Sequence, residues 1–335
     1  MHYSEEDLLV TTAYTPPFTI TDEITNLVIE IAELTGKMTV SQQLSKNPKL
    51  RRENRVKSIH SSLAIEQNSL TVEQVSDVID GRRVLGPPQD ILEVKNAFEA
   101  YEIMAGLDPY SVKDLLKAHK IMMNGLVKEA GVFRSKGVGV YAGDQLIHAG
   151  TPANYVPELI GQLFDWLRTS KLHPLVKSCI FHYEFEFIHP FADGNGRTGR
   201  LWHTLILAKW QEFFLWIPIE TIIHERQSDY YKAINASNNA VESTIFVQFM
   251  LELIRDLLKE LADGRAYGGS YGGDQAMTNK VLELIKENGK ISAAQMAERL
   301  GISQRQVQRI ISQLKDDGVI ERIGANRNGE YRVIE

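Results

Sequence analysis

The stretch His189-Pro-Phe-Ala-Asp-Gly-Asn-Gly-Arg-Thr-Gly-Arg200 stands immediately before a helical pattern at Leu201–Trp210. Its three glycines allow the backbone to turn so that successive N–H groups point into one concavity, where the start of the helix adds partial positive charge. Such a turn binds anions. Arg197 and Arg200 are three residues apart, so their guanidinium groups reach the same side of the first turns and favour phosphate oxygens.

Two further side chains of this stretch predict chemistry at a phosphate. Asp193 is placed to hold Mg²⁺ through a carboxylate oxygen, with phosphates supplying other ligands. His189 lies close enough to the cradle to take a proton from an attacking hydroxyl. Because in-line displacement at phosphorus needs mainly positioning, charge neutralisation and a base, the stretch predicts nucleotidyl transfer. The alternative is a surface glycine turn before a helix with scattered arginines.

The pattern His189-x-Phe191-x-Asp193-Gly-Asn-Gly-Arg197-x-x-Arg200 resembles the signature of the Fic family. The resemblance implies a helical core in which His189 deprotonates a Ser, Thr or Tyr hydroxyl of a target protein, or of the chain itself. That hydroxyl attacks the α-phosphate of ATP, so that AMP is transferred and pyrophosphate leaves. By the same resemblance Asp193 is the Mg²⁺ ligand and ATP is the co-substrate.

The resemblance also assigns the nucleotide contacts. Asn195 and nearby amides receive charge of the α-phosphate, the two arginines bind the outer phosphates, and Phe191 anchors the loop in the core. A tyrosine near the adenine is expected at Tyr231, for which a core position is an equal alternative. The nucleotide-binding set is therefore Gly194, Asn195, Gly196, Arg197, Thr198, Gly199, Arg200 and Tyr231.

Residues 138–148 contain two short β-prone runs that flank Ala142-Gly143, so a hairpin between helices is predicted. In the Fic family a flap at this place pairs with an extended segment of the target by strand addition. The segment therefore predicts the contact with a target protein, against the alternative of a plain surface excursion.

Upstream, Ser62 and Glu66 are four residues apart and share one helix face. From the residues alone, a solvated face is the favoured interpretation. The family resemblance reverses it, because many Fic proteins carry an inhibitory helix of pattern Ser/Thr-x-x-x-Glu-Gly/Asn. There the glutamate pairs with the last arginine of the signature, here Arg200, at the position of the γ-phosphate. Gln67 departs from the pattern, so we expect the helix to continue and stop at Asn68.

The whole chain is predicted to be mainly α: a Fic-type helical core with a small β-hairpin flap and a C-terminal winged helix-turn-helix domain. The expected parts are an N-terminal helical region with the inhibitory helix, the catalytic core, a Gly/Ser-rich flexible linker and the winged helix. Their ranges are 1–88, 89–262, 263–275 and 276–335.

The winged helix is predicted from the order of its elements. A helix at Asn279–Glu287 precedes a capping box at Ser292–Gln295, Gly301 ends the second helix, and another capping box opens the third. Two β-prone runs follow. Apolar spacing places four residues in the core of the module, and three polar ones outside: Val307, Ile310, Ile311 and Leu314 against Gln304, Arg305 and Gln308.

The partner of this module stays open. Gln and Arg read base edges, which favours DNA. Residues 276–335 carry only ten Lys and Arg against eight Asp and Glu, which is thin support for phosphate binding. Docking to a protein or formation of a homodimer is the alternative.

Composition and net charge narrow the class of protein further. The net charge of −6 gives no global attraction to nucleic acid, and no apolar stretch reaches the ~20 residues that span a bilayer. The single cysteine, Cys179, excludes an internal disulfide and is expected as a buried thiol. We therefore expect a cytoplasmic protein without membrane contact. The readings that compete with an adenylyltransferase are a DNA-binding regulator with a nucleotide-sensing core, and transfer or removal of a different nucleotide.

Overall fold

The computed structural model describes residues 14–41, 47–137, 139–142, 145–149, 151–262, 274–316, 319–323 and 330–334. These residues form two compact units, of which the first ends at Leu257 and the second begins at Leu258. The helices of the first unit are α1 Asp22–Ser41, α3 Pro48–Ile65, α4 Val72–Ile79, α5 Pro88–Ile103, η2 Met104–Gly106, α6 Val112–Met122, η3 Ala153–Tyr155, α7 Val156–Thr169, α8 Pro174–Ile188, α9 Asn195–Trp210, η4 Glu212–Trp216, α10 Ile219–Glu225, α11 Gln227–Ala240 and most of α12 Thr244–Ala262.

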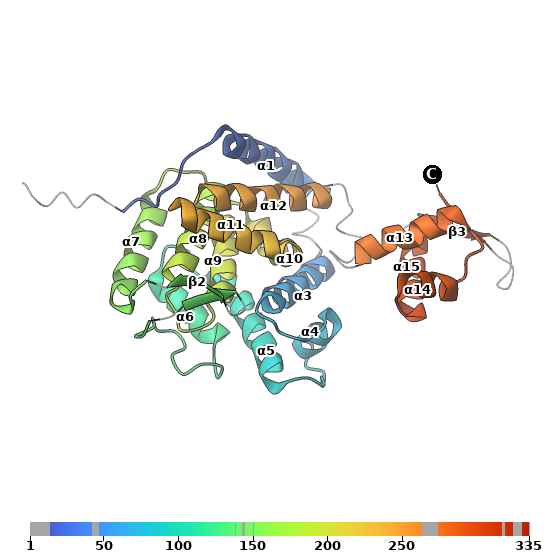
Figure 1. The fold of residues 1–335 in the computed structure, drawn as a ribbon, viewed down its shortest axis with the longest axis horizontal. Helices are drawn as coiled ribbons and strands as arrows, with labels where there is room; N and C mark the ends of the chain where they lie inside the picture. Colours follow the sequence, from blue (N-terminus) through green and yellow to red (C-terminus); the bar gives the residue numbers. More distant parts are fainter. Residues whose placement is uncertain are drawn as a thin grey trace, which may run out of the picture. The chain divides into compact units, whose positions relative to one another are not determined.

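The centre of the first unit is the pair α8 and α9 (Figure 1), which pack against each other and are almost entirely buried. Further helices contact this pair from several sides: α7 on α8, and α6 and α3 on α9. Residues around the whole circumference of α8 are buried, as is typical of a helix in the middle of a helical unit. Cys179 on α8 is fully buried, and burial raises the pKa of its thiol to about 12, as expected for a structural cysteine.

The hairpin predicted at 138–148 is present. Strand β1, Gly139–Ala142, pairs with β2, Gln145–Ala149, in an antiparallel register from Gly139 opposite Ala149 to Ala142 opposite Gln145. The register shifts between Val140 and Tyr141, which marks a bulge. The hairpin forms the small two-stranded sheet of the otherwise helical first unit.

The second unit has the element order of a winged helix: α13 Asp274–Glu287, α14 Ala293–Leu300, α15 Gln304–Asp316, β3 Ile320–Ile323 and β4 Glu330–Val333. The capping box of Ser292 and Gln295 is formed, and Gly301 ends α14 at φ 66°. The predicted apolar face of α15 is confirmed, since its four residues belong to the buried core with Val281 and Met296. Helix α13 begins five residues before the predicted start at Asn279.

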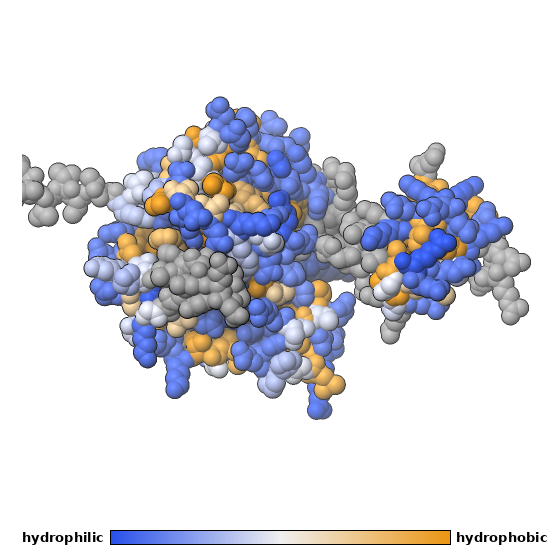
Figure 2. Space-filling model, viewed as in Figure 1, coloured by the Kyte–Doolittle hydropathy of each residue, from blue (hydrophilic) through white to orange (hydrophobic). Residues whose placement is uncertain are grey.

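The linker predicted at 263–275 lies outside the described residues, except for its last two positions. Among the described helices, none combines the length and the hydropathy that a bilayer span needs. In the view of Figure 2 the surface is mainly hydrophilic, with hydrophobic residues in small separate areas.

Candidate active site

His189 ends α8 in a left-handed conformation, with φ 53° and ψ 63°. Its N–H still donates to the carbonyl of Phe185, at 2.9 Å, so the chain leaves the helix in one residue. A non-glycine residue in this region of φ and ψ costs free energy and persists only where its surroundings hold it.

Arg134 supplies much of that support. It is 3% exposed, and its guanidinium donates to the carbonyls of His189 (2.7 Å), Ile188 (3.2 Å), Lys136 (2.9 Å) and also Thr151. Its backbone N–H donates to the carbonyl of Pro190, at 3.0 Å. One buried side chain thus fixes the turn that carries the histidine.

His119 of α6 supports the next part of the turn. Its ring stacks on Phe191 with 3.6 Å between centroids and 4° between planes. The N–H of Gly131 donates to Nδ1, so Nε2 carries the proton and donates to the carbonyl of Asp193, each at 2.9 Å. Burial lowers the pKa of His119 to about 4, so the ring is neutral and keeps this tautomer. The expected anchoring of Phe191 in the core is present, since Phe191 is fully buried.

Helix α9 begins on Gly194, which adopts φ 80° and would place any Cβ 2.5 Å from the sulfur of Met123. The side chain of Asn195 is engaged within the turn: its Oδ1 accepts from the N–H of Phe191 (2.8 Å) and its Nδ2 donates to the carbonyl of the same residue (2.9 Å). In this conformation Asn195 therefore shapes the turn, and the first backbone N–H groups of α9 precede any carbonyl of the helix that could accept from them.

Arg197 and Arg200 are both buried, and both already contact carboxylates. The Nη1 of Arg197 lies 3.3 Å from Glu93 Oε1, and its Nη2 lies 3.1 Å from Asp193 Oδ1. The second oxygen of Glu93 accepts from Asn68 Nδ2, at 2.8 Å, so this carboxylate connects the first arginine to the residue that follows α3.

Arg200 contacts both residues predicted for the inhibitory helix. Its Nε donates to Ser62 Oγ (3.1 Å), and its Nη2 donates to the Ser62 carbonyl and to Glu66 Oε1 (2.8 Å each). The guanidinium is 2% exposed, and although burial acts to lower its pKa, the pairing with Glu66 raises the pKa of Arg200 above the ordinary value. This pair places a carboxylate on the second arginine of the cradle.

Two glycines of the motif owe their identity to this packing. A Cβ on Gly196 would lie 2.4 Å from the Glu66 carboxylate and 2.8 Å from Nη1 of Arg200. A Cβ on Gly199 would lie 2.9 Å from the carboxylate of Glu186 on α8. Gly196 thus leaves the space that Glu66 fills, and Gly199 permits α8 and α9 to approach.

The end of α3 differs from the prediction. The helix stops at Ile65, and Gln67 itself takes the left-handed conformation at φ 68°. Two bonds close the end: Gln67 N–H to the Ala64 carbonyl (3.0 Å) and Asn68 N–H to the Leu63 carbonyl (3.1 Å). The expected continuation to Asn68 is therefore wrong, because this pair of bonds and the engaged side chain of Asn68 outweigh the poor intrinsic preference of Gln.

The remaining predicted contacts lie as follows. Thr198 is 1% exposed and its N–H donates to the Gly194 carbonyl, so in this conformation it belongs to the helix interior. Tyr230 is buried with its hydroxyl 3.2 Å from Nε2 of His182, whereas Tyr231 is 37% exposed. Burial, and next the charge of Glu66, raise the pKa of Tyr231, whose ring contacts that of Tyr230 with 5.4 Å between centroids.

Asp193 fits a hard cation. Its carboxylate is 57% exposed at the edge of the cradle. Among the described residues no group of three or more His, Cys, Asp or Glu could hold a metal by itself. A Mg²⁺ ion that is bound through one carboxylate and the phosphates of its nucleotide needs no such group.

Four supporting residues escaped the sequence analysis: Glu93, His119, Arg134 and Glu186. His119 and Glu93 lie on the buried faces of α6 and α5, where spacing alone predicts packing. Arg134 lies outside any regular element, so no periodic pattern marks it. For Glu186 the sequence did offer a signal, because it lies only three residues before His189.

Comparison with known proteins agrees with this arrangement. The model of the Fic/DOC family matches residues 109–207, and a winged helix-turn-helix DNA-binding model matches residues 276–321. The crystal structure of a Fic family protein from Desulfovibrio desulfuricans G20 is 45% identical, with a TM-score of 0.73 over 96% of this chain and 98% of that one. The helical core that carries the α8–α9 turn places the first unit in the class of Fic-domain proteins, and the second unit is a winged helix. The chain belongs to the Fic family.

More distant relatives share part of the chain. Protein adenylyltransferase fic-1 of Caenorhabditis elegans is 29% identical over 195 residues, which are 54% of this chain and 36% of that protein. Protein adenylyltransferase Fic of Nematostella vectensis is 26% identical over 57% of this chain and 45% of its own length. The chain thus spans less than half the length of these curated relatives. A structure of C. elegans Fic-1, 20% identical with a TM-score of 0.60 over 73% of this chain, shares the fold.

Proposed function

We propose that the protein is an autoinhibited protein adenylyltransferase, which moves AMP from ATP to a Ser, Thr or Tyr hydroxyl of a target protein or of the chain itself. The observation that carries this proposal is the buried contact of Ser62 and Glu66 with Arg200 inside the Fic motif. This contact places the Glu66 carboxylate on an arginine that would otherwise bind the outer phosphates of the nucleotide. The Fic adenylyltransferases among its relatives support the choice of reaction.

The reaction follows from the residues of the turn. His189 takes the proton of the target hydroxyl while the hydroxyl oxygen forms a bond to the α-phosphorus and the bond to pyrophosphate breaks. The N–H groups at the start of α9 and the two motif arginines neutralise the phosphate oxygens. Mg²⁺ held by Asp193 would add Lewis-acid neutralisation of the same phosphates. The hairpin β1–β2 offers a strand edge for the target segment.

The inhibitory contact works by occupation. Arg200 is 2% exposed and directs three hydrogen bonds to α3, so in this conformation it has little capacity left for a γ-phosphate. ATP must displace Glu66 from the arginine before the nucleotide adopts the productive position. A charge-assisted pair at 2.8 Å with one partner buried makes this displacement costly.

The test is labelling with ATP and Mg²⁺, read by intact mass. Glu66→Gly is expected to acquire AMP at a rate at least about tenfold above that of the unsubstituted protein, because the charge-assisted bond that holds Arg200 is lost. His189→Ala in the Glu66→Gly background should abolish labelling while ATP still binds.

Glu66→Gln serves as the matched control, because it keeps the length of the side chain and removes only its charge. It should label at an intermediate rate. Labelling by Glu66→Gly no faster than by the unsubstituted protein would show that the inhibitory contact is misassigned. A nucleotide panel in the same assay identifies the donor from the mass that is added.

We propose DNA as the partner of the second unit, because the matching family model is a DNA-binding one and Gln304 and Gln308 are exposed one turn apart on α15. The low net charge of the unit predicts weak binding with a shallow dependence on salt, because few phosphates are neutralised. Fluorescence anisotropy with random-sequence duplex DNA at two salt concentrations tests this. Unchanged anisotropy at low salt would favour a protein partner.

A further inference from the structure

The first unit contains a second concentration of arginines, away from the motif. A cavity of about 460 Å³ is bordered by α3, α4, α5 and η4. Three of its lining residues are arginines of α3, namely Arg51, Arg52 and Arg55, and its aromatic wall is Trp216 of η4. A cavity of this volume accepts a small organic ligand.

Two of these arginines contact one aromatic ring. The guanidinium carbons of Arg51 and Arg55 each lie 4.9 Å from the centroid of the Trp216 ring. Arg55 is 6% exposed, and its Nε is buried without a hydrogen-bond acceptor among the described residues. Its nearest carboxylate, that of Glu102, is 3.9 Å away and 55% exposed. A buried guanidinium with an unsatisfied Nε, in a cavity that three arginines and only two carboxylates line, favours an anion.

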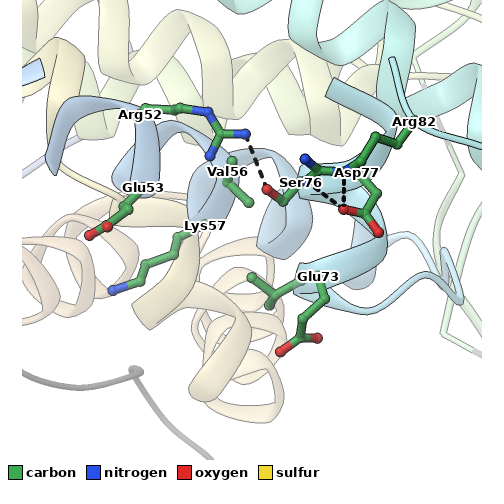
Figure 3. Close-up of a pocket in the computed structure, with 9 residues that line it drawn as sticks. Arg52, Glu53, Val56, Lys57, Glu73, Ser76, Asp77 and Arg82 are labelled. Atoms are coloured by element: carbon green, nitrogen blue, oxygen red, sulfur yellow. Dashed lines mark hydrogen bonds and ion pairs between the residues drawn. The ribbon is translucent and has the colours of Figure 1, made fainter. Parts of the chain in front are cut away.

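The neighbouring cavity shows the contrast. It lies on the other side of Arg52 and Val56, is about 360 Å³ in volume, and is bordered by α3 and α4 (Figure 3). There Arg82 pairs with Asp77 at 2.6 Å, and Arg52 reaches Ser76 at 3.2 Å and pairs with Asp80. Three cations and three carboxylates line this neighbouring cavity, whereas three arginines and two carboxylates, Asp80 and Glu102, line the first one. Only the first cavity therefore has an excess positive charge for an anion.

We propose that the cavity of Arg51, Arg55 and Trp216 binds a small organic phosphate of about the size of a sugar phosphate. The two guanidinium groups would donate to the phosphate oxygens, and the remaining volume would hold the organic part. Arg52 stays with Asp80 and closes the cavity toward α4.

Because the cavity borders α3, a ligand bound there would act on the inhibitory contact at the end of that helix. Helix α3 carries Arg51, Arg55 and Ser62, and Glu66 directly follows its last residue. It is already docked beside the cavity, since Asn54 Nδ2 donates to the Trp216 carbonyl at 2.9 Å. A phosphate held between α3 and η4 would strengthen this docking and thereby the inhibitory contact. This consequence rests on the proposed function, whereas binding itself does not.

Isothermal titration of the full chain with glucose 6-phosphate tests the binding site, with glucose and inorganic phosphate as probes of the two halves of the ligand. The unsubstituted protein should bind glucose 6-phosphate, bind inorganic phosphate more weakly, and leave glucose unbound. Arg51→Gln should weaken binding about tenfold, the usual cost of one charge-assisted partner. Arg168→Gln, which removes the same charge from an exposed position on α7, should bind normally.

Amide hydrogen exchange supplies a readout independent of catalysis. Glucose 6-phosphate should slow exchange at 56–66 in the unsubstituted protein and not in Arg51→Gln. Equal affinity of Arg51→Gln and the unsubstituted protein would overturn the assignment, because the anion would then occupy the motif. Absence of binding at 10 mM (about a hundredfold above a 0.1 mM site) would overturn it as well. Equal affinity for inorganic phosphate and glucose 6-phosphate would overturn the proposal that the cavity also holds the organic part of the ligand.

Discussion

Glu93 and Glu66 each contact one arginine of the motif, but the chain holds them differently. Glu66 lies at the end of α3 with its side chain 33% exposed, whereas Glu93 is within α5, 11% exposed, and bonded to Asn68 as well. The first carboxylate is free to leave its arginine when α3 shifts. The second belongs to the packed core and positions Arg197.

Glu93→Gln should therefore lower the free energy of unfolding by about 1–3 kcal/mol, because the buried Arg197 loses its charged partner. Urea denaturation measures this directly. Glu99→Gln, at an exposed position of the same helix, is the control and should change stability by less than about 0.5 kcal/mol. Equal stability of both variants would mean that Asp193 alone suffices for Arg197.

Glu186 predicts a dependence of stability on pH. Burial, opposed by Arg200 and reinforced by Glu66, raises the pKa of its carboxyl from 4.5 to about 7. The folded protein therefore binds a proton more tightly than the unfolded chain, so this group makes stability fall as the pH rises from about 4.5 to about 7. Below that window its favourable contribution is complete.

Glu186→Gln should remove this fall, which amounts to about 3 kcal/mol. The measurement is urea denaturation at pH 5 and pH 8, with Glu99→Gln as the reference for all other groups. A variant whose stability falls between the two pH values as much as that of the reference would contradict the assignment.

At the scale of the element, the end of α3 is the informative case. Gln67 holds φ 68° with a side chain that disfavours it. Gln67→Gly should raise the free energy of unfolding by about 0.5–1 kcal/mol, because glycine adopts this conformation without strain. Thermal unfolding followed by circular dichroism checks the gain. Gln67→Ala, which retains a Cβ, should show none, and a similar gain for both would place the effect elsewhere.

The same helix end shows what a sequence can predict. The contact of Glu66 with Arg200 was predicted from the resemblance to the Fic family, whereas the Ser62–Glu66 spacing alone favoured a solvated face. The left-handed Gln67 was missed, since its conformation is decided by the bonds of Asn68 to a distant helix. His119 and Arg134 were missed for the same reason: their function lies in carbonyl groups that only the fold brings near.

At the scale of the whole molecule, each unit has its own core, and the second is complete within residues 281–320 for its buried apolar set. Calorimetry of the full chain should therefore show two transitions. A chain that ends at Ala262 keeps α12 whole and should retain the transition of the larger unit within about 2 °C, because no core residue is removed. A shift above about 5 °C would show that the units stabilise each other.

A homodimer and a cytoplasmic location remain predictions.

Glu66 and Arg200 belong to one polypeptide, which sets the terms of the competition with nucleotide. An intramolecular partner acts at an effective concentration that linkage fixes, commonly in the millimolar range, and dilution does not change it. The balance between held and released molecules should thus be the same at nanomolar and micromolar protein. Only the nucleotide level, or a ligand that moves α3, would shift this balance, so under the proposed inhibition the chain would respond to its surroundings rather than to its own abundance.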